Sequence, residues 1–449
     1  MKRISQSFAV LSDRVFGALA GDEVGLLSVE AETSDFVRLS RGRVRQAGSV
    51  EQAYLGIELA RGQRHAAATV ALSGDVEIDA RRAIEVLDEL RPLLAELPED
   101  PYFCYDSSDA REEACDDAPG LAAREQALAA IFDAAGDHDL VGIYAAGPVF
   151  RGFASSRGRF LASEQHSFNF DFSLHENGAR AVKGSYAGYR FEADELARRV
   201  ADAASKLALL SRPAREVAPG GYRVYLAPAA TAELLQMLSW GGFGLKSWRT
   251  KQTPLLRLVE GQRELDARVT LHEGRSGGSD GAKAHLQFDN FGFRKPEHLT
   301  LVSAGKIGEP LVSARSAAEF DATPTGCGTG ESPSALSLEG GELAIADAGA
   351  AVGDGLYVGN LWYLNYSDRS ACRITGMTRF ATFWVEGGEP VAPVTAMRFD
   401  ESIYDALGPK LVALTREREL LLDADTYGQR STASICVPGL VVDDFTLTL

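Results

Sequence analysis

The sequence predicts an α+β protein with two domains, each a largely antiparallel or mixed β-sheet packed with helices. Its 449 residues exceed the usual scale of roughly 100 to 200 residues per domain. Short β-patterns recur in both halves, with a few helical patterns between them. A connector containing Pro and Gly, residues 213–221, follows a long amphipathic helix. We therefore predict domains at residues 1–215 and 216–449.

The beginning of the chain predicts a helix followed by a meander of strands. Apolar residues at helical spacing between Phe8 and Leu19 indicate the helix, and Gly21 is its expected stop. Arg41-Gly42 and Arg61-Gly62 are turn signals between the strands. The strands are predicted at residues 26–30, 36–40, 43–46, 54–59 and 66–72. A second helix is predicted at residues 80–90, which Pro92 should bend or end.

Residues 98–120 form the most polar stretch and are predicted to be a surface loop. A cation site is the functional alternative, built from Asp106, Asp109, Glu112 and Asp116. Solvated acids are commoner than such sites, and no Ca²⁺-loop spacing is present. The rest of the first domain predicts helices at residues 121–132 and 193–210 and strands at 141–144, 150–154, 168–174 and 186–191.

The second domain is predicted to begin with a strand at residues 222–226 and a helix at 231–240. Apolar residues occupy both alternation phases from Leu356 to Tyr366, which predicts a strand buried on both faces. Residues 374–385 predict another strand, and Gly387-Gly388 supplies the positive φ angles of a two-residue hairpin turn. The returning strand carries Pro390 and Pro393, which cannot donate ladder hydrogen bonds and so favour an edge or bulge.

Composition narrows the class of function. The formal charge of −17 and the absence of a basic stripe argue against nucleic-acid binding. Five widely spaced cysteines without a CxxC pair favour a reduced, cytoplasmic setting. Polar residues interrupt the N-terminal segment, so no signal peptide is expected, and no run of 18 apolar residues exists. We therefore expect a soluble, cytoplasmic protein.

Motifs for chemistry are mostly missing. Histidine pairs at metal-ligand spacing do not occur, because Ser276 and Gly277 stand where His272-Glu273 would need a second histidine. The glycines of residues 326–330 favour a flexible loop over a phosphate cradle. Within that loop, Cys327 has no flanking base and is expected to be buried or idle rather than reactive. The four tryptophans favour packing roles over a stacking platform.

Several longer motifs carry a family resemblance. They are DGLYVGNLWYLNYSD at 354–368, EGGEPVAPV at 386–394, DESIYDALGPKL at 400–411, GYRVYLAPAATAELL at 221–235, FDNFG at 288–292 and the closing VPGLVVDDFTLTL. Together they resemble the TldD/TldE (PmbA) family of peptide-processing proteins over nearly the whole chain. The resemblance implies that residues 400–411 form a helix.

The resemblance also locates a lost metal motif. In the catalytic TldD branch, the helix after the first strand of the second domain carries HExxxH, and a cysteine near the C-terminus completes the metal site. Here Gln236, Met237 and Gly241 stand where His, Glu and His would be expected. Cys436 directly precedes VPGLVV, which is similar to the ending of the TldE branch, and is not expected to be a ligand. The chain thus resembles the TldE/PmbA branch, which lacks the metal.

This branch implies a non-catalytic subunit of a heterodimeric metallopeptidase. The chain would hold no cofactor, and zinc or iron is expected in a TldD-like partner. The two subunits would enclose a chamber for unfolded peptides, with the second-domain sheet of this chain as one wall and strand edges that bind the peptide.

Two alternatives stay open at this point. One is a stand-alone, homodimeric hydrolase with a non-standard site built from residues such as His272, His285, Cys327 or Asp289. The even spacing of His272, His285 and His298 fits neither a helix nor a strand repeat, so we interpret it as coincidence. The other alternative is a peptide-binding scaffold protein in a biosynthetic pathway.

Overall fold

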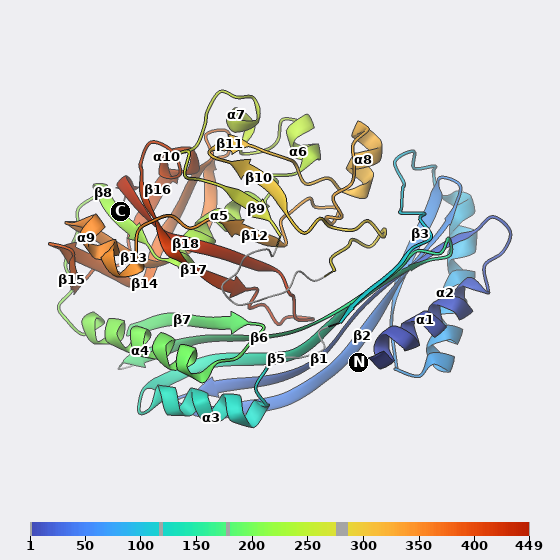
Figure 1. The fold of residues 1–449 in the computed structure, drawn as a ribbon, viewed down its shortest axis with the longest axis horizontal. Coiled ribbons are helices and arrows are strands. Elements are labelled where there is room, and N and C mark those ends of the chain that lie inside the picture. The colour runs from blue at the N-terminus through green and yellow to red at the C-terminus, as the bar shows by residue number, and fades with distance from the viewer. Residues whose placement is uncertain (1, 116–119, 177–179, 275–285, 449) are drawn as a thin grey trace.

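The computed structural model of the chain describes residues 2–115, 120–176, 180–274 and 286–448. The described strands form two sheets, one of seven strands and one of eleven. Figure 1 shows the seven-stranded sheet as a long curved layer beneath the eleven-stranded sheet. The α+β class with two sheet-and-helix units is therefore confirmed.

The seven-stranded sheet and its helices come from the first half of the chain. The helices are α1 (Lys2–Phe16), α2 (Val76–Glu96), α3 (Arg124–Ala135) and α4 (Ala193–Leu210). The strands are β1 (Val24–Ser40), β2 (Arg43–Arg61), β3 (Arg64–Ala71), β4 (Arg111–Cys115), β5 (Asp139–Ser155), β6 (Phe160–Glu176) and β7 (Arg180–Gly188).

The eleven-stranded sheet comes from the second half, and the predicted boundary at residues 215 and 216 lies between α4 and β8. Its strands are β8 (Gly220–Leu226), β9 (Leu271–Glu273), β10 (Leu299–Ser303), β11 (Lys306–Ile307), β12 (Ala335–Leu338), β13 (Gly355–Asp368), β14 (Arg373–Glu386), β15 (Glu389–Pro393), β16 (Arg398–Ser402), β17 (Leu411–Leu422) and β18 (Ser434–Leu447). The helices are α5 (Pro228–Gln236), α6 (Leu245–Arg249), α7 (Leu256–Val259), α8 (Ala314–Phe320), α9 (Ala348–Val352) and α10 (Ile403–Ala406), with 3₁₀ turns η1 (Met237–Ser239) and η2 (Ile345–Asp347).

The predicted meander is present, but its strands are longer than the sequence indicated. The seven-stranded sheet has the order β3-β2-β1-β5-β6-β4, with β7 also paired to β6. The two strands predicted at 26–30 and 36–40 are parts of one strand, β1, and those predicted at 43–46 and 54–59 are parts of β2. The chain turns between β1 and β2 at Arg41-Gly42, as expected. Polar residues separate the apolar runs in each, yet the backbone ladder continues through them because its hydrogen bonds do not depend on side-chain polarity.

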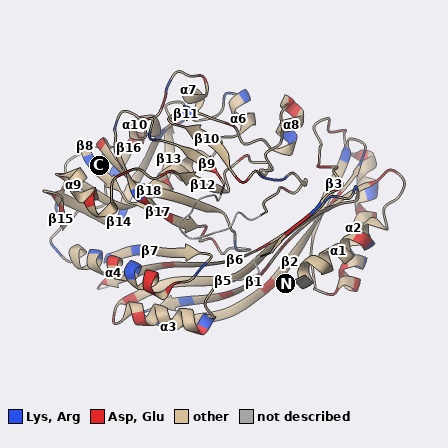
Figure 2. Ribbon diagram, viewed as in Figure 1, with Lys and Arg blue, Asp and Glu red and all other residues tan. Residues whose placement is uncertain are grey.

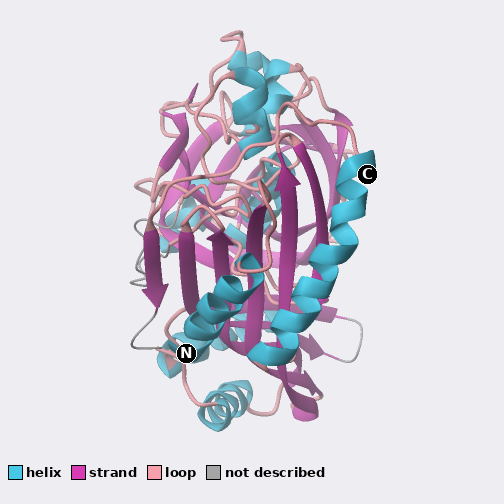
Figure 3. Cartoon of the chain, turned by 90° about the vertical axis from the view of Figure 1, so that its right-hand side faces the viewer, coloured by secondary structure: helices cyan, strands magenta, loops and turns pink. Residues whose placement is uncertain are grey.

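Four helices pack against the seven-stranded sheet in two groups. The apolar residues of α1 and α2 share a core with β1, β2 and β5, and Figure 3 shows these two helices lying across the strands. The apolar stripes of α3 and α4 share a second core with β5, β6 and β7. The predicted helix 193–210 is α4 and is confirmed residue for residue.

The two outcomes predicted at Pro92 were a bend or an end of the helix, and the end is excluded because α2 continues to Glu96. Another prediction for the first half was wrong. The stretch 98–120 is not loop throughout, because β4 within it pairs in parallel with β6. The charged residues of β4 hide this strand in the sequence, since its register rests on backbone hydrogen bonds to a neighbour about 50 residues away.

The hairpin of the second half is confirmed. Gly387 and Gly388 have φ angles of 58° and 90°, as a two-residue turn between β14 and β15 requires. The returning strand is β15, which carries both prolines and ends at Pro393. Among the described strands, β15 pairs with β14.

Three expectations for the second half were wrong. Strand β13 is buried only as far as Leu361, because Trp362 and Tyr363 beyond it are exposed to solvent. The expected packing role also fails for Trp362 and Trp240, which are both exposed. Residues 400–411 are not one helix, since only α10 is helical there and strands β16 and β17 flank it.

The two sheets are joined by a buried arginine. Arg430, in the segment between β17 and β18, donates hydrogen bonds to the Ser34 hydroxyl (3.0 Å) and to the carbonyl of Gly147 (3.1 Å). It also donates to the carbonyl of Ser167 (2.8 Å). This side chain therefore ties the second half of the chain to β1, β5 and β6.

Charge is mixed over the whole molecule. Figure 2 shows basic and acidic residues side by side along α2 and α4. None of the described helices is both long and apolar enough to cross a membrane.

Candidate functional site

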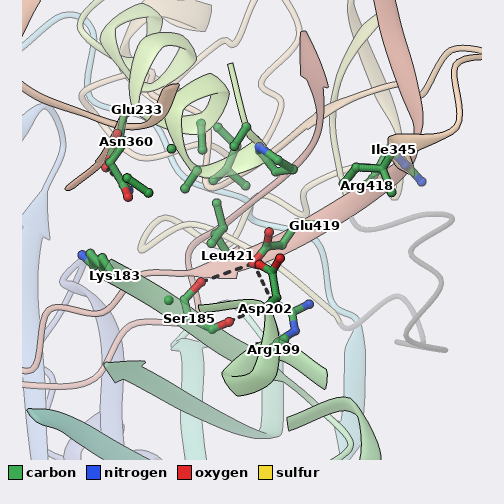
Figure 4. A pocket seen from close by; sticks show the side chains of 18 of the residues that line it. Lys183, Ser185, Arg199, Asp202, Glu233, Ile345, Asn360, Arg418, Glu419 and Leu421 are labelled. Carbon is green, nitrogen blue, oxygen red and sulfur yellow. Dashed lines mark hydrogen bonds and ion pairs between the residues drawn. The ribbon is translucent and has the colours of Figure 1, made fainter. Parts of the chain in front are cut away.

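A cavity of about 910 Å³ lies between the two sheets. We call it the inter-sheet cavity. Strand β7 and helix α4 contribute one side of its lining, and α5, β13 and β17 contribute the other. Figure 4 shows side chains from these elements pointing toward one another across the space. The two halves of the chain therefore build this site jointly.

Helix α4 presents charged residues to the cavity because its apolar stripe faces the core. Arg199 Nε donates to Glu195 Oε1 (2.7 Å), one turn earlier on the same helix. Its Nη1 donates to the Ser185 carbonyl (2.8 Å) and to the carboxylate of Glu419 on β17. This pair crosses the cavity and is drawn in Figure 4.

A second charged pair lies further along α4. Lys206 Nζ donates to Asp202 Oδ2 (2.6 Å) and lies 5.2 Å from the ring centre of Tyr357. Burial by itself would lower the pKa of Lys206, but Tyr357 and the Asp202 carboxylate outweigh it and raise that pKa above its ordinary value. Lys206 therefore stays protonated at neutral pH.

Glu233 on α5 is a titratable group of this cavity whose pKa is shifted toward neutral pH. Its carboxylate accepts hydrogen bonds from the Leu361 backbone N–H and from Asn360 Nδ2 (3.2 Å). Burial raises the pKa of Glu233 to about 7, although these donors and the charge of Lys183 lower it in part. Glu233 can therefore gain or lose a proton near neutral pH and can act as donor or acceptor toward a bound molecule.

The structure separates the three positions that the resemblance aligns with a metal motif. Gln236 is exposed and lines the inter-sheet cavity at the end of α5. Met237 begins η1 and is only 4% exposed, within the apolar core. Gly241 has a φ of 80°, and a Cβ built there would lie 3.1 Å from Arg369 Nη2. The predicted helix 231–240 thus ends early, so these positions do not share one helix face.

These residues do not fit a zinc or iron ion. An amide, a buried thioether and a glycine offer none of the imidazole, carboxylate or thiolate ligands that such ions prefer. Within the described parts of the chain, no group of three or more His, Cys, Asp and Glu residues is placed to hold a metal. Cys436 lies on β18, paired in register with Ser337 and Leu420.

Two of the evenly spaced histidines meet, while the third lies outside the described residues. The ring centres of His272 and His298 are 3.9 Å apart, because β9 and β10 are neighbouring antiparallel strands. His272 Nε2 also lies 2.8 Å from Glu339 Oε1. Burial lowers the pKa of His298, and the neighbouring His272 adds to that effect. Strand pairing, which the spacing did not indicate, produces this contact.

Asp289 and Cys327 line a second cavity of about 680 Å³, apart from His272. Burial raises the pKa of Cys327 to about 11, so the thiol stays protonated at neutral pH. The prediction of a buried cysteine is confirmed. The stand-alone site drawn from these three residues is therefore not assembled in one place.

Two of the four acids proposed for a cation site, Asp106 and Glu112, are bound by arginines, and no such pair is seen for Asp109 among the described residues. Arg159 Nε lies 3.2 Å from Asp106 Oδ2, and Arg159 Nη1 donates to Glu112 Oε1 (3.1 Å). Glu112 also accepts from Arg294 (3.0 Å). Asp116 lies outside the described residues. Paired carboxylates of this kind are typical of structural ion pairs rather than of a cation site.

Several residues of the inter-sheet cavity escaped the sequence analysis. Arg199 and Glu419 are 220 residues apart, so no local pattern links them. Glu233 had a usable signal, because it stands three residues before Gln236 on the helix that the resemblance singles out. Its burial, which shifts its pKa, depends on β13 and could not be read from α5.

The fold and this cavity define a two-domain α+β protein with a cavity between its sheets. Residues 219–449 match the family model described as the PmbA/TldA metallopeptidase C-terminal domain. The match spans more than half of the chain, which therefore belongs to the PmbA/TldD family.

Solved structures share the whole fold. TldE from Thermococcus kodakarensis has a TM-score of 0.79 at 14% identity, covering 99% of this chain and 100% of its own. A putative modulator of DNA gyrase from Thermotoga maritima has a TM-score of 0.76 at 15% identity, covering 98% and 100%. One from Bacteroides thetaiotaomicron has a TM-score of 0.72 at 16% identity, covering 99% and 98%. No match was found among the curated proteins.

Proposed function

We propose that this chain is a TldE/PmbA-like, non-catalytic subunit of a heterodimeric metallopeptidase that processes unfolded peptides. The observation that carries the proposal is the state of the motif positions Gln236, Met237 and Gly241. Their side chains cannot bind a catalytic metal, and their backbone does not present them to a common point. The peptide cleavage would then take place at the zinc or iron ion of a TldD-like partner.

The inter-sheet cavity gives this subunit its proposed task. Its lining combines paired charges with apolar surface from both sheets, which suits an extended peptide whose backbone needs donors and acceptors. Glu233, Asn360 and Gln236 are among the neutral or near-neutral groups of the lining that can hydrogen-bond such a backbone. In this proposal the chain shapes and selects the peptide without cleaving it, in the cytoplasm.

Metal analysis and co-expression test the proposal. The purified chain should hold no stoichiometric zinc or iron and should not cleave an unfolded peptide. Co-expressed with a relative that carries HExxxH, it should copurify with that relative, and the pair should cleave. A tightly bound metal, or cleavage by the chain alone, would contradict the non-catalytic role and favour a stand-alone hydrolase.

A gain-of-function variant gives a second test. The triple variant Gln236→His, Met237→Glu, Gly241→His should stay inactive, because Met237 lies in the core and Gly241 adopts a φ of 80°. It should also unfold more easily, since Met237→Glu buries a charge at a cost of about 3 kcal/mol or more. Met237→Leu is the matched control and should cost less than about 1.5 kcal/mol. Metal-dependent cleavage by the triple variant would show that the scaffold is closer to catalytic.

A further inference from the structure

The second cavity, which we call the Asp289 cavity, lies between the curved sheet and loops of the second half. Its lining includes residues of β1, β2 and β5 together with the segments 286–291, 326–329 and 429–433. Ser334 and Ala433 line both this cavity and the inter-sheet cavity. The two cavities are therefore neighbours along the same interface between the sheets.

The Asp289 carboxylate is held in a fixed orientation by hydrogen bonds to one of its two oxygens, while the other oxygen has no partner in the described chain. Its Oδ1 accepts hydrogen bonds from the backbone N–H groups of Phe291 and Phe293, both at 2.9 Å. The residue is only 5% exposed, and within the described chain its Oδ2 has no hydrogen-bond partner. Burial raises the pKa of Asp289 to about 6, against the two N–H groups and Arg151, which lower it. A buried oxygen of this kind is costly unless something binds it.

The other charged residues that line this cavity already have partners. Among the acids, Glu30 pairs with Arg151 (3.0 Å) and Glu58 lies 2.6 Å from His65 Nδ1.

Among the cations of the lining, Lys295 is bound to Glu273 (2.7 Å) and to the Ser334 hydroxyl (2.6 Å). Arg430 is bound to the acceptors of β1, β5 and β6 described above. Asp289 is thus the charged group of the described lining that lacks a partner of opposite charge in direct contact.

The walls near Asp289 are apolar. Leu286, Phe288, Phe291 and Ala314 contribute to the lining, and Phe288 packs on the curved sheet beside them. An apolar wall beside a carboxylate suits a group with a hydrocarbon stem and a cationic end. A free phosphate or a second carboxylate would meet the negative charge of Asp289 and is disfavoured.

We propose that the Asp289 cavity binds a primary ammonium group of the bound peptide, either a lysine side chain or the free amino terminus. The proposal rests on the peptide-binding function above and adds to it a preference for substrate charge. Oδ2 is buried in this structure, so a small shift of the side chains that cover it would open it to the cavity. The ammonium would then donate a charge-assisted hydrogen bond to Oδ2 while the alkyl stem lies against the phenylalanines. Because Ser334 and Ala433 line both cavities, a peptide in the inter-sheet cavity could extend to Asp289.

Small probes test this site without requiring peptide binding. Saturation-transfer NMR would compare Nα-acetyl-lysine N-methylamide, norleucine N-methylamide with a free amino group, and the neutral Nα-acetyl-norleucine N-methylamide. At least one ammonium probe should bind the wild type about tenfold more tightly than the neutral probe. Binding of the acetylated lysine probe would identify a lysine side chain as the group recognised. Binding of the norleucine probe with a free amino group would identify the amino terminus. Equal binding of all three would overturn the proposal.

Variants locate the binding. Asp289→Asn keeps Oδ1 as the acceptor for the two backbone N–H groups and removes the charge, so it should lose the tenfold preference. Asp22→Asn, which removes a carboxylate that is 76% exposed and lies outside the lining of both cavities, is the matched control and should keep it. Retention of the preference by Asp289→Asn would overturn the proposal. Failure of an unfolded test peptide to bind the wild type would instead contradict the proposed function, whereas the probes decide the Asp289 site by themselves.

Discussion

The two cavities between the sheets differ in how their charges are balanced. In the inter-sheet cavity, Arg199 and Lys206 contact carboxylates, and the pair Arg199–Glu419 crosses from one half of the chain to the other. In the Asp289 cavity, the other lining charges are likewise paired, but Asp289 itself is not. The first arrangement links the two sheets through an ion pair, while the second leaves the Asp289 carboxylate without a counter-charge in direct contact among the described residues.

This difference separates stability from recognition. Removing one partner of a buried ion pair lowers the free energy of unfolding strongly, because the other charge is then left buried and uncompensated. A buried charge without a partner destabilises the folded chain and favours any ligand that neutralises it. Single substitutions can distinguish the paired charges from the unpaired one.

The largest effect is expected at the wall of the Asp289 cavity. Glu273 is fully buried and accepts from Lys295 (2.7 Å) and from the backbone N–H of Ser334 (2.9 Å). Glu273→Ala should lower the free energy of unfolding by about 3–5 kcal/mol, because Lys295 would be left buried without its counter-charge. Urea unfolding measures this loss.

The matched control is Glu297→Ala. Glu297 is largely exposed and lies 3.8 Å from Arg294, so its removal should change the free energy of unfolding by less than about 0.5 kcal/mol. A loss under about 1 kcal/mol for Glu273→Ala would show that the buried pair does not hold the wall.

An intermediate effect should appear as a pH dependence in the inter-sheet cavity. The pKa of Glu233 is raised from 4.5 to about 7 in the folded chain, so between these pH values the folded chain binds more protons than the unfolded chain. The stabilisation is complete below pH 4.5 and is lost as the pH rises through 7, amounting to about 2–3 kcal/mol.

Glu233→Gln removes this titration and can keep both contacts, since its amide oxygen can accept from Leu361 and its NH₂ can donate to a reoriented Asn360. The free energy of unfolding of the variant minus that of the wild type should therefore rise between pH 4.5 and 8 by about 2–3 kcal/mol. Urea unfolding at several pH values measures it. A difference that stays constant over this range would show that Glu233 titrates normally.

A smaller effect is expected for the pair that crosses the inter-sheet cavity. Arg199→Met should cost about 2 kcal/mol, because it leaves Glu419 and Glu195 in partly buried surroundings without their donor. Its neighbour Arg198 contacts the same Glu195 but is 66% exposed, so Arg198→Met should cost less than about 0.5 kcal/mol. Equal costs for the two variants would mean that the crossing pair does not hold the sheets together.

Local patterns predicted the elements whose cause is local. The stripe of α4 and the turn at Gly387-Gly388 are both present, because a 3.6-residue period and two positive φ angles are properties of short segments. Prediction failed for β4 and for residues 400–411, where pairing with distant strands decides the structure. The exposed end of β13 was also not predicted, because the burial of a strand depends on which distant parts of the chain cover it.

The sequence alone shows that Gln236, Met237 and Gly241, the residues that the resemblance aligns with the metal motif, include no His, Cys, Asp or Glu. Which charges are paired became apparent only in the folded chain. Arg199 forms an ion pair with Glu419, 220 residues away, because the packing of the two sheets brings them together. The same packing places no cation in contact with Asp289 Oδ2 in the described chain. The pairing of charges in a folded protein depends on the distances between side chains and on their burial, and a short sequence segment reveals neither.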